Sequence, residues 1–162
     1  MIWLALLGLV ALSCFALVIL VGAPYLPTLS PQVAAALELA DLQSGQTLLE
    51  LGCGDGKVLI AAAKQGINVV GYELNPILAL IAWVRTRRYH REVRVVCGNF
   101  WRHDWPDADA IFVFLLPRYM AKLDQKIIQS AIKPVKLISF AFLVPKRKVA
   151  RQQGGVYMYH YR

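Results

Sequence analysis

A glycine-rich stretch follows the first apolar strand pattern of the sequence, and its residue types suit the binding of a small molecule through the backbone. It reads ELGCGDG over residues 50–56. Because glycine has no Cβ, the chain can turn tightly there and its backbone can approach a ligand closely. Asp55 places a negative charge inside the loop, which repels a phosphate and favours a ligand with an amino group or a positive sulfur.

A second acid, Glu73, ends the next strand pattern about 20 residues after the glycines, where a carboxylate can accept both hydroxyls of a ribose. The fingerprint of dinucleotide-binding loops requires a small residue where this chain has Lys57. The glycines and the two acids therefore predict a ribose-containing ligand that carries positive charge, rather than a dinucleotide.

Strand and helix patterns alternate through the rest of the chain, which predicts an α/β fold with a mostly parallel sheet and helices on both faces. The predicted strands span 47–51, 68–73, 93–97, 110–116, 136–143 and 156–161. The predicted helices span 31–41 (with Ser30 as N-cap), 57–65, 76–89 (with Asn75 as N-cap) and 119–132. In such sheets ligands bind beyond the carboxyl ends of the strands. The candidate site therefore consists of the loops that follow Leu51, Glu73, Cys97 and Leu116.

Residues 50–56 resemble motif I of the class I methyltransferases that depend on S-adenosylmethionine (SAM). Four further segments resemble a narrower group: PYLPT at 24–28, GYELNP at 71–76, NFW at 99–101 and FLLPRYM at 114–120. This group comprises the membrane-anchored protein-lysine methyltransferases of mitochondria, which act on the c-ring protein of ATP synthase and the adenine nucleotide translocase, and their prokaryotic relatives. The resemblance implies a Rossmann-like fold, SAM as cofactor, and methyl transfer to a lysine of a membrane-associated protein.

The resemblance also implies a role for each matching residue. The glycines would cradle the methionine part and the ribose of SAM, Asp55 would hold its amino group, and Glu73 would bind the ribose hydroxyls. Leu74 would pack on the adenine, whose edge would meet Asn99 and Phe100. The expected cofactor-binding residues are Glu50, Gly52, Cys53, Gly54, Asp55, Gly56, Glu73, Leu74, Asn75, Asn99 and Phe100. The expected catalytic residues, beside the departing methyl group, are Leu116, Pro117 and Tyr119.

Several of these residues also have a purely structural interpretation. Glu50 could only brace the glycine loop, Cys53 is expected to be a small filler, and Pro117 could simply end a strand. The Tyr119 phenol either orients a substrate amine or serves only as a hydrogen-bonding handle. Three acids would either attract a substrate lysine or act as turn residues, namely Asp104, Asp107 and Asp109. The spacing of the cysteines and histidines predicts no metal site, and no general base is evident.

The first residues predict a membrane anchor. Residues 2–22 contain no charged side chain, and 21 positions at about 1.5 Å each reach roughly 30 Å, the thickness of a bilayer core. A cleaved signal peptide would have a basic start, which this run lacks. We expect a single-pass transmembrane helix over 1–23, a linker with the first helix over 24–46, and a SAM-binding domain over 47–162. The catalytic domain would face the cytosol in a prokaryote, because SAM is made there, and in a eukaryote the resemblance implies the inner mitochondrial membrane.

The net charge of +8 is concentrated in the last third, where residues 118–162 hold ten basic residues and one acid. Such a surface can attract anionic lipid headgroups or nucleic acid. Alternatively, it is a solvated basic face that only aids solubility. The resemblance favours the membrane surface and a membrane protein substrate over nucleic acid. Two alternatives remain open: a methyltransferase for a lipid, a small lipophilic molecule or RNA, and a non-catalytic SAM-binding membrane module.

Overall fold

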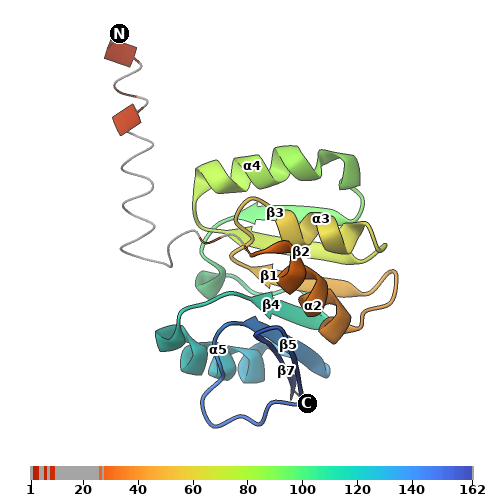
Figure 1. The fold of residues 1–162 in the computed structure, drawn as a ribbon. Coiled ribbons are helices and arrows are strands. Elements are labelled where there is room, and N and C mark those ends of the chain that lie inside the picture. The colour runs from red at the N-terminus through yellow and green to blue at the C-terminus, as the bar shows by residue number, and fades with distance from the viewer. Residues whose placement is uncertain (1, 4–5, 7, 10–25, 27, 162) are drawn as a thin grey trace.

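The computed structural model describes residues 2–3, 6, 8–9, 26 and 28–161, and a twisted sheet lies at its centre (Figure 1). The strand order is β3-β2-β1-β4-β5-β7-β6, so the order reverses direction between β1 and β4. Neighbouring strands from β3 to β5 are parallel, whereas β7 is antiparallel to both of its neighbours. The strands are β1 (Thr47–Leu51), β2 (Asn68–Glu73), β3 (Val93–Cys97), β4 (Ala110–Val113), β5 (Val135–Phe140), β6 (Arg151–Gln153) and β7 (Val156–Tyr161).

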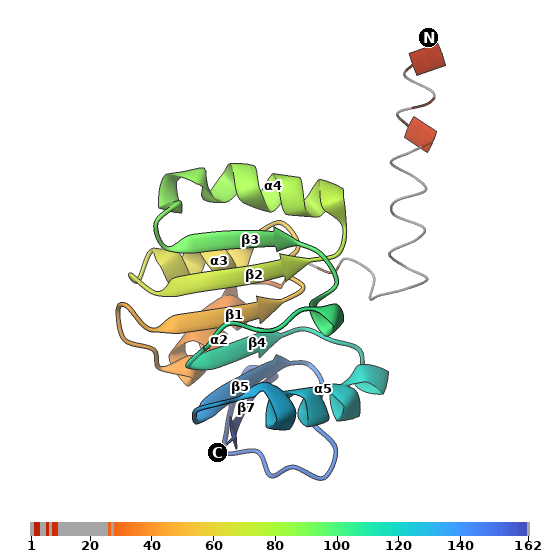
Figure 2. The ribbon, with the colours of Figure 1, turned by 180° about the vertical axis from the view of Figure 1, so that it is seen from behind.

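Helices cover both faces of the sheet, as the sequence predicts. Figure 1 shows α2 and α3 on one face, and the reverse view in Figure 2 shows α5 on the other. The helix α4 lies along the β3 edge and packs against α3, β2 and β3. The helices are α2 (Ser30–Ala40), α3 (Lys57–Ala63), α4 (Pro76–Thr86) and α5 (Pro117–Ser130), with short 3-10 turns η1 (Arg87–Tyr89) and η2 (Phe100–Arg102).

Each face of the sheet has its own hydrophobic core, because successive side chains of a strand point to opposite faces. Leu48 and Ala110 pack under α2 and α3, while their neighbours Leu49 and Ile111 pack under α5. All four side chains are almost fully buried. Apolar residues without alternation are expected in a strand that is covered on both sides, and the central strands therefore form a rigid platform for the loops at their ends.

Most predicted elements are confirmed, four strands of them to the residue: 47–51, 68–73, 93–97 and 156–161. The predicted N-cap of α4 is also confirmed, because Asn75 Oδ1 accepts a hydrogen bond from Ile77 N at 2.9 Å. The N-cap predicted at Ser30 is wrong: Ser30 is already helical, and Leu29 precedes α2 without any side-chain cap. The helix α3 and the strand β5 both end earlier than predicted.

Two boundaries differ from the prediction for identifiable reasons. The helix α5 begins at Pro117 and not at residue 119, because proline fits the first turn of a helix, where no backbone N–H is needed. The strand β4 accordingly ends at Val113, so Pro117 does not end a strand. The strand β6 was not predicted. It forms a hairpin with β7 through Gly154 and Gly155, which both have the positive φ that a two-residue hairpin turn requires.

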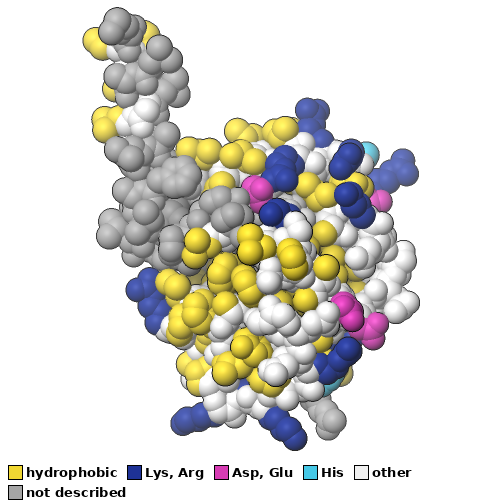
Figure 3. Space-filling model, viewed as in Figure 1, with side chains coloured by type: hydrophobic (Ala, Val, Ile, Leu, Met, Phe, Trp, Pro, Cys, Tyr) yellow, Lys and Arg dark blue, Asp and Glu magenta, His cyan; other side chains and the backbone are white. Residues whose placement is uncertain are grey.

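The predicted anchor over residues 1–23 lies mostly outside the described residues. Its five described positions, Ile2, Trp3, Leu6, Gly8 and Leu9, are helical and exposed. Within the part of the chain that the structure describes, no helix has both the length and the apolar character needed to cross a bilayer. The helix α4 does expose large apolar side chains, and Figure 3 shows hydrophobic residues along the top of the molecule, where α4 lies.

Gly71 in β2 allows the glycine loop to lie directly on the sheet. A Cβ on Gly71 would lie 2.9 Å from Cys53 Cβ and 2.8 Å from Leu59 Cδ2. The amides of Gly52 and Cys53 both donate to the Tyr72 carbonyl oxygen at 2.9 Å. The close contact between the loop and β2 therefore depends on a missing methyl group in the middle of the strand.

We expect Gly71→Ala to lower the free energy of unfolding by about 1–3 kcal/mol, since overpacking a rigid site forces its neighbours to move. Gly98→Ala is the matched control, because its Cβ would meet only the end of the exposed His103 ring, which can turn away. Urea denaturation of both variants measures the difference. Equal losses in the two variants would contradict this view of Gly71.

Candidate functional site

The loops at the carboxyl ends of β1, β2 and β3 are joined by backbone hydrogen bonds into one surface. Gly52 N donates to the Tyr72 carbonyl, and Gly98 N donates to the Glu73 carbonyl at 2.8 Å. These loops carry most of the predicted cofactor-binding residues. The structure therefore brings together segments that lie far apart in the sequence, at the edge where the strand order reverses and where such sheets bind ligands.

Glu73 is the centre of this surface. Its side chain is only 7% exposed, and its two carboxylate oxygens accept hydrogen bonds from Gly54 N and Asn75 N, both at 2.8 Å. The carboxylate thus holds the glycine loop and the start of α4 in place together. Because a carboxylate has about four acceptor positions, two remain for the hydroxyls of a ribose.

Glu50 lies beneath the glycine loop and is 4% exposed. Among the described residues, its Oε2 atom has no hydrogen-bond partner. Burial raises the pKa of Glu50 well above its usual value, and the negative charges of Glu73 and Asp55 raise this pKa further. A buried carboxyl oxygen without a partner is costly unless something pairs with it. A cationic ligand group at this position would supply the missing partner.

Asp55 is engaged on the outer side of the loop. Its carboxylate forms an ion pair with Arg85 of α4, whose guanidinium also donates to the Asp55 carbonyl oxygen at 3.0 Å. The predicted contact between Asp55 and the amino group of the cofactor would have to replace this ion pair. Of the two acids in the loop, Glu50 has the oxygen that lacks a partner among the described residues.

Two further loop residues have structural environments. Cys53 is buried, and burial followed by the nearby charge of Glu50 raises the pKa of its thiol, which keeps it protonated and unreactive. Gly56 has a positive φ of 79° and packs against α4, because a Cβ there would lie 3.2 Å from Ala82 Cβ. Gly56 therefore sets the distance between the loop and α4, a role that follows from packing alone.

The predicted adenine contacts lie on the loops after β2 and β3. Leu74 is half-buried at the end of β2, beside the predicted ribose site. Asn99 Oδ1 accepts a hydrogen bond from Trp101 N at 3.0 Å and thereby caps η2. Phe100 is half-buried against Trp101, with 4.7 Å between ring centroids. All three stay predictions as adenine contacts.

The predicted catalytic residues lie at the start of α5. Leu116 is half-buried as its N-cap residue, and Pro117 is its exposed first residue. The ring of Tyr119 lies 6.2 Å from that of Trp101, on the face of the sheet that α5 covers. Tyr119 is therefore packed among aromatic side chains, and its role toward a substrate amine stays a prediction.

An aromatic cluster at the ends of β4 and β5 was not predicted. The ring of Phe114 lies 4.6 Å from Phe140 and 6.3 Å from Phe142. The sequence contained a signal for this cluster. Phe114 directly follows β4 and Phe140 ends β5, so both lie at the carboxyl edge of the sheet. The cluster forms an apolar wall shortly before Leu116, where the methyl acceptor was expected.

Asp107 and Asp109 lie at the opposite edge of the sheet. Of their two interpretations, this position excludes attraction of a substrate lysine to the site and leaves that of turn residues. Asp109 accepts hydrogen bonds from Thr47 N at 2.8 Å and Lys133 Nζ at 2.7 Å, at the start of β1. Burial alone would raise the pKa of Asp109, but these two hydrogen bonds and the positive charges of Lys133 and Lys136 together outweigh burial and lower it. Asp109 therefore stabilises the amino edge of the sheet.

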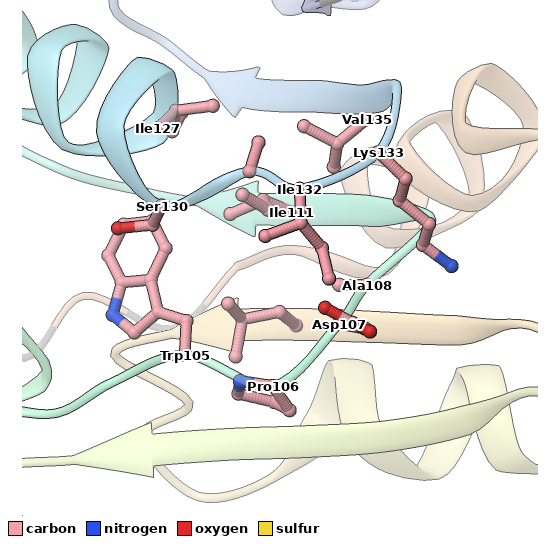
Figure 4. Close-up of a pocket in the computed structure, with 12 residues that line it drawn as sticks. Trp105, Pro106, Asp107, Ala108, Ile111, Ile127, Ser130, Ile132, Lys133 and Val135 are labelled. Atoms are coloured by element: carbon pink, nitrogen blue, oxygen red, sulfur yellow. The ribbon is translucent and has the colours of Figure 1, made fainter.

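A small pocket also lies at this amino edge (Figure 4). Asp107 and Trp105 line it from the loop before β4, and Ile127 lines it from α5. Its cavity of about 20 Å³ has room for roughly one water molecule. The indole of Trp105 donates to the Phe100 carbonyl at 2.9 Å, so this ring is a packing residue.

Comparison with known proteins agrees with this geometry. Residues 50–151 match the model of the ANTKMT methyltransferase domain family. The lysine N-methyltransferase of the ATP synthase c-ring protein from Xenopus laevis is 31% identical over 124 residues, 75% of this chain and 54% of that protein. A protein-lysine N-methyltransferase of Saccharolobus islandicus is 31% identical over 150 residues, covering 84% of this chain and 92% of the relative. The chain thus spans about half the length of the first relative and nearly all of the second.

Among solved structures, an RNA methyltransferase from Salinibacter ruber in complex with S-adenosyl-L-homocysteine superposes with a TM-score of 0.76. The two chains are 28% identical, and the match covers 84% of this chain and 92% of the other. This likeness and the family model confirm the Rossmann-like methyltransferase fold and SAM as the cofactor. The residues fit it, because Glu73 can take the ribose and the unpaired oxygen of Glu50 can take a cationic group.

We expect Glu73→Gln to weaken SAM binding on the order of 10–100-fold, because a charged acceptor is lost and the amide repels one of the two backbone N–H donors. Titration calorimetry measures the affinity, with thermal unfolding as a check on folding. Glu38→Gln is the matched control, since Glu38 accepts a hydrogen bond from Gln153 on the exposed side of α2. Unchanged affinity in Glu73→Gln would contradict the ribose assignment.

The raised pKa of Glu50 predicts a pH dependence of SAM binding. A cation binds the ionised carboxylate, so below the raised pKa a proton must leave first, and affinity falls by up to about tenfold per pH unit. Affinity therefore rises as pH increases above 4.5, the ordinary pKa of a glutamate, until the raised pKa is passed. Glu50→Gln should flatten this profile in calorimetry. An identical pH slope in the variant would exclude Glu50 as the titrating group.

Proposed function

The chain belongs to the ANTKMT methyltransferase domain family, and from this premise we propose that it is a membrane-tethered enzyme that methylates a lysine side chain of a membrane-associated protein. The observation that carries the proposal is the Glu73 carboxylate, which holds Gly54 N and Asn75 N at the carboxyl edge of the sheet. This arrangement suits a bound SAM molecule. The lysine acceptor is supported by the two relatives above, both protein-lysine methyltransferases by name.

The proposed reaction forms a bond between the lysine nitrogen and the methyl carbon while the bond from sulfur to that carbon breaks. When bound, SAM supplies an electrophilic methyl group on a positive sulfur. The protein mainly positions the two partners, which accounts for a site without an obvious base. An acceptor lysine must first lose a proton, and an apolar wall promotes this because it lowers the pKa of an ammonium group. The Phe114, Phe140 and Phe142 cluster is such a wall at the ends of β4 and β5.

The membrane tether in this proposal rests on the uncharged run at residues 2–22. Its length suits one crossing of a bilayer. The short distance from this run to the start of α2 would keep the catalytic edge close to the membrane and favour an acceptor lysine near the surface. We place the catalytic domain on the cytosolic side in a prokaryote, because SAM is made in the cytosol. In a eukaryote, the resemblance to the mitochondrial lysine methyltransferases supports the inner mitochondrial membrane.

RNA is the second candidate acceptor. The Salinibacter ruber structure is named an RNA methyltransferase, and this chain matches it over 92% of its length. The α5 face also combines cations with aromatic rings, as RNA-binding surfaces do. Lys122 Nζ lies 4.5 Å from the ring of Trp101, and Lys126 Nζ lies 4.8 Å from that of Trp105. In this structure the lysines cover the rings, which makes stacking of a base less favourable than in an open platform.

Methyl-labelled SAM distinguishes these candidates. The full-length protein in detergent is incubated with membranes and RNA from its own source, with Glu73→Gln as the inactive control. We expect label in a small membrane protein that yields methyl-lysine on hydrolysis, and a loss of at least about tenfold in the control, since the cofactor is held less tightly. Label in RNA alone would favour the second candidate. Label in lipid alone would contradict both.

A further inference from the structure

The helix α4 exposes four large apolar side chains and buries mainly small ones. Leu80 is 60% exposed, Trp83 52% and Val84 52%, and Ile81 is also exposed. The side that faces the domain consists of Leu78, Ala79, Ala82 and Thr86. A helix that only covers a sheet places its large apolar residues inward. In α4 the buried side has Leu78 as its one large apolar residue. The four neighbouring large apolar side chains on the exposed surface mark an interaction site.

The inward side of α4 is already fully used by the domain. Ala82 lies so close to Gly56 that a Cβ on the glycine would be 3.2 Å from Ala82 Cβ. The Thr86 hydroxyl donates to the Ala82 carbonyl at 2.8 Å. The helix therefore sits closely on the glycine loop through small residues and cannot rotate to bury Leu80 or Trp83 without losing this contact.

The charged side chains that α4 and η1 themselves contribute to this surface are all positive. Residues 77–91 contain four arginines and no acid. Arg85 is paired with Asp55, whereas the Arg87 guanidinium lies 5.2 Å from the ring of Trp83 and that of Arg88 lies 4.9 Å from the ring of Tyr89. Figure 3 shows Lys and Arg side chains beside the hydrophobic ones along the top of the molecule, where α4 lies. Arginines that flank an apolar strip containing tryptophan are typical of helices that lie in a membrane interface.

We propose that α4 and η1 form a second membrane contact, in which the exposed face of α4 lies in the interface of an anionic bilayer. Leu80, Ile81, Trp83 and Val84 enter the boundary between headgroups and acyl chains. Arg87 and Arg88 lie beside the phosphates, toward which long basic side chains extend. This contact goes beyond the proposed function and does not depend on the methyl acceptor.

Lipid fits this surface better than a second copy of the chain does. A symmetric dimer with parallel α4 helices would bring the arginines at their carboxyl ends together, and one with antiparallel helices would leave those arginines without any negative partner. Anionic headgroups instead neutralise those arginines, while the acyl region takes up the apolar side chains. Because α4 starts directly after Glu73 and Asn75, the contact would also fix the height of the cofactor loop above the bilayer.

The fluorescence of Trp83 tests this proposal without any methyl transfer. The full-length protein is reconstituted into vesicles of phosphatidylcholine with phosphatidylglycerol, made with ordinary or brominated acyl chains. The emission of the wild type minus that of Trp83→Phe isolates the signal of Trp83. We expect brominated lipid to quench at least about half of this signal, because the ring lies at acyl depth. Quenching in vesicles of phosphatidylcholine alone should be weaker.

Two double variants provide matched controls. Leu80→Glu with Val84→Glu should abolish most of the quenching. Ile128→Glu on α5 with Ile132→Glu, just after the end of α5, should leave it unchanged, although Ile128 is 59% exposed and Leu80 60%. Protein that floats with the vesicles while Trp83 is quenched only by aqueous iodide would overturn the α4 contact and leave the anchor intact. Shielding of Trp83 from both quenchers, with a crosslinked dimer, would overturn it in favour of a second copy.

Discussion

The structure around the site depends on one carboxylate. Glu73 accepts hydrogen bonds from the glycine loop through Gly54 N and from the start of α4 through Asn75 N. These bonds, and the missing side chain of Gly71 beneath Cys53, hold the loop against β2. The order of the parallel strands then places the ends of β3 and β4 beside it. A site of this kind needs little loop length, because the sheet itself brings its parts together.

The negative charges of the site favour a bound cation and destabilise the protein when no ligand is bound. Burial raises the pKa of Glu50, and the negative charges of Glu73 and Asp55 raise it further. The Oε2 atom of Glu50 lacks a partner among the described residues. Asp55 is paired with a basic side chain, Arg85. Functional sites commonly keep such locally unfavourable arrangements, which the ligand relieves. A positively charged cofactor is therefore complementary to the site, and a phosphate-rich one is not.

Short sequence motifs were sufficient to predict much of this arrangement. Contacts between residues that lie far apart in the sequence could not be predicted from such motifs. The cap at Asn75 and the position of Glu73 follow from short motifs, because a strand end and a proline-started helix are encoded within a few residues. The ion pair between Asp55 and Arg85 joins residues 30 positions apart and depends on how α4 packs. The sequence left two roles open for Asp109, and its position just before β4, at the amino edge opposite the site, excludes the role toward a substrate lysine.

A crystal structure of the full-length protein with S-adenosyl-L-homocysteine tests the central claim most directly. The account predicts ribose hydroxyls about 2.7–3.0 Å from the Glu73 carboxylate and a ligand ammonium group beside Glu50 Oε2. The Gly54 and Asn75 amides would stay on Glu73. A ligand bound elsewhere, or one that leaves Glu73 and Glu50 without contact, would contradict the account.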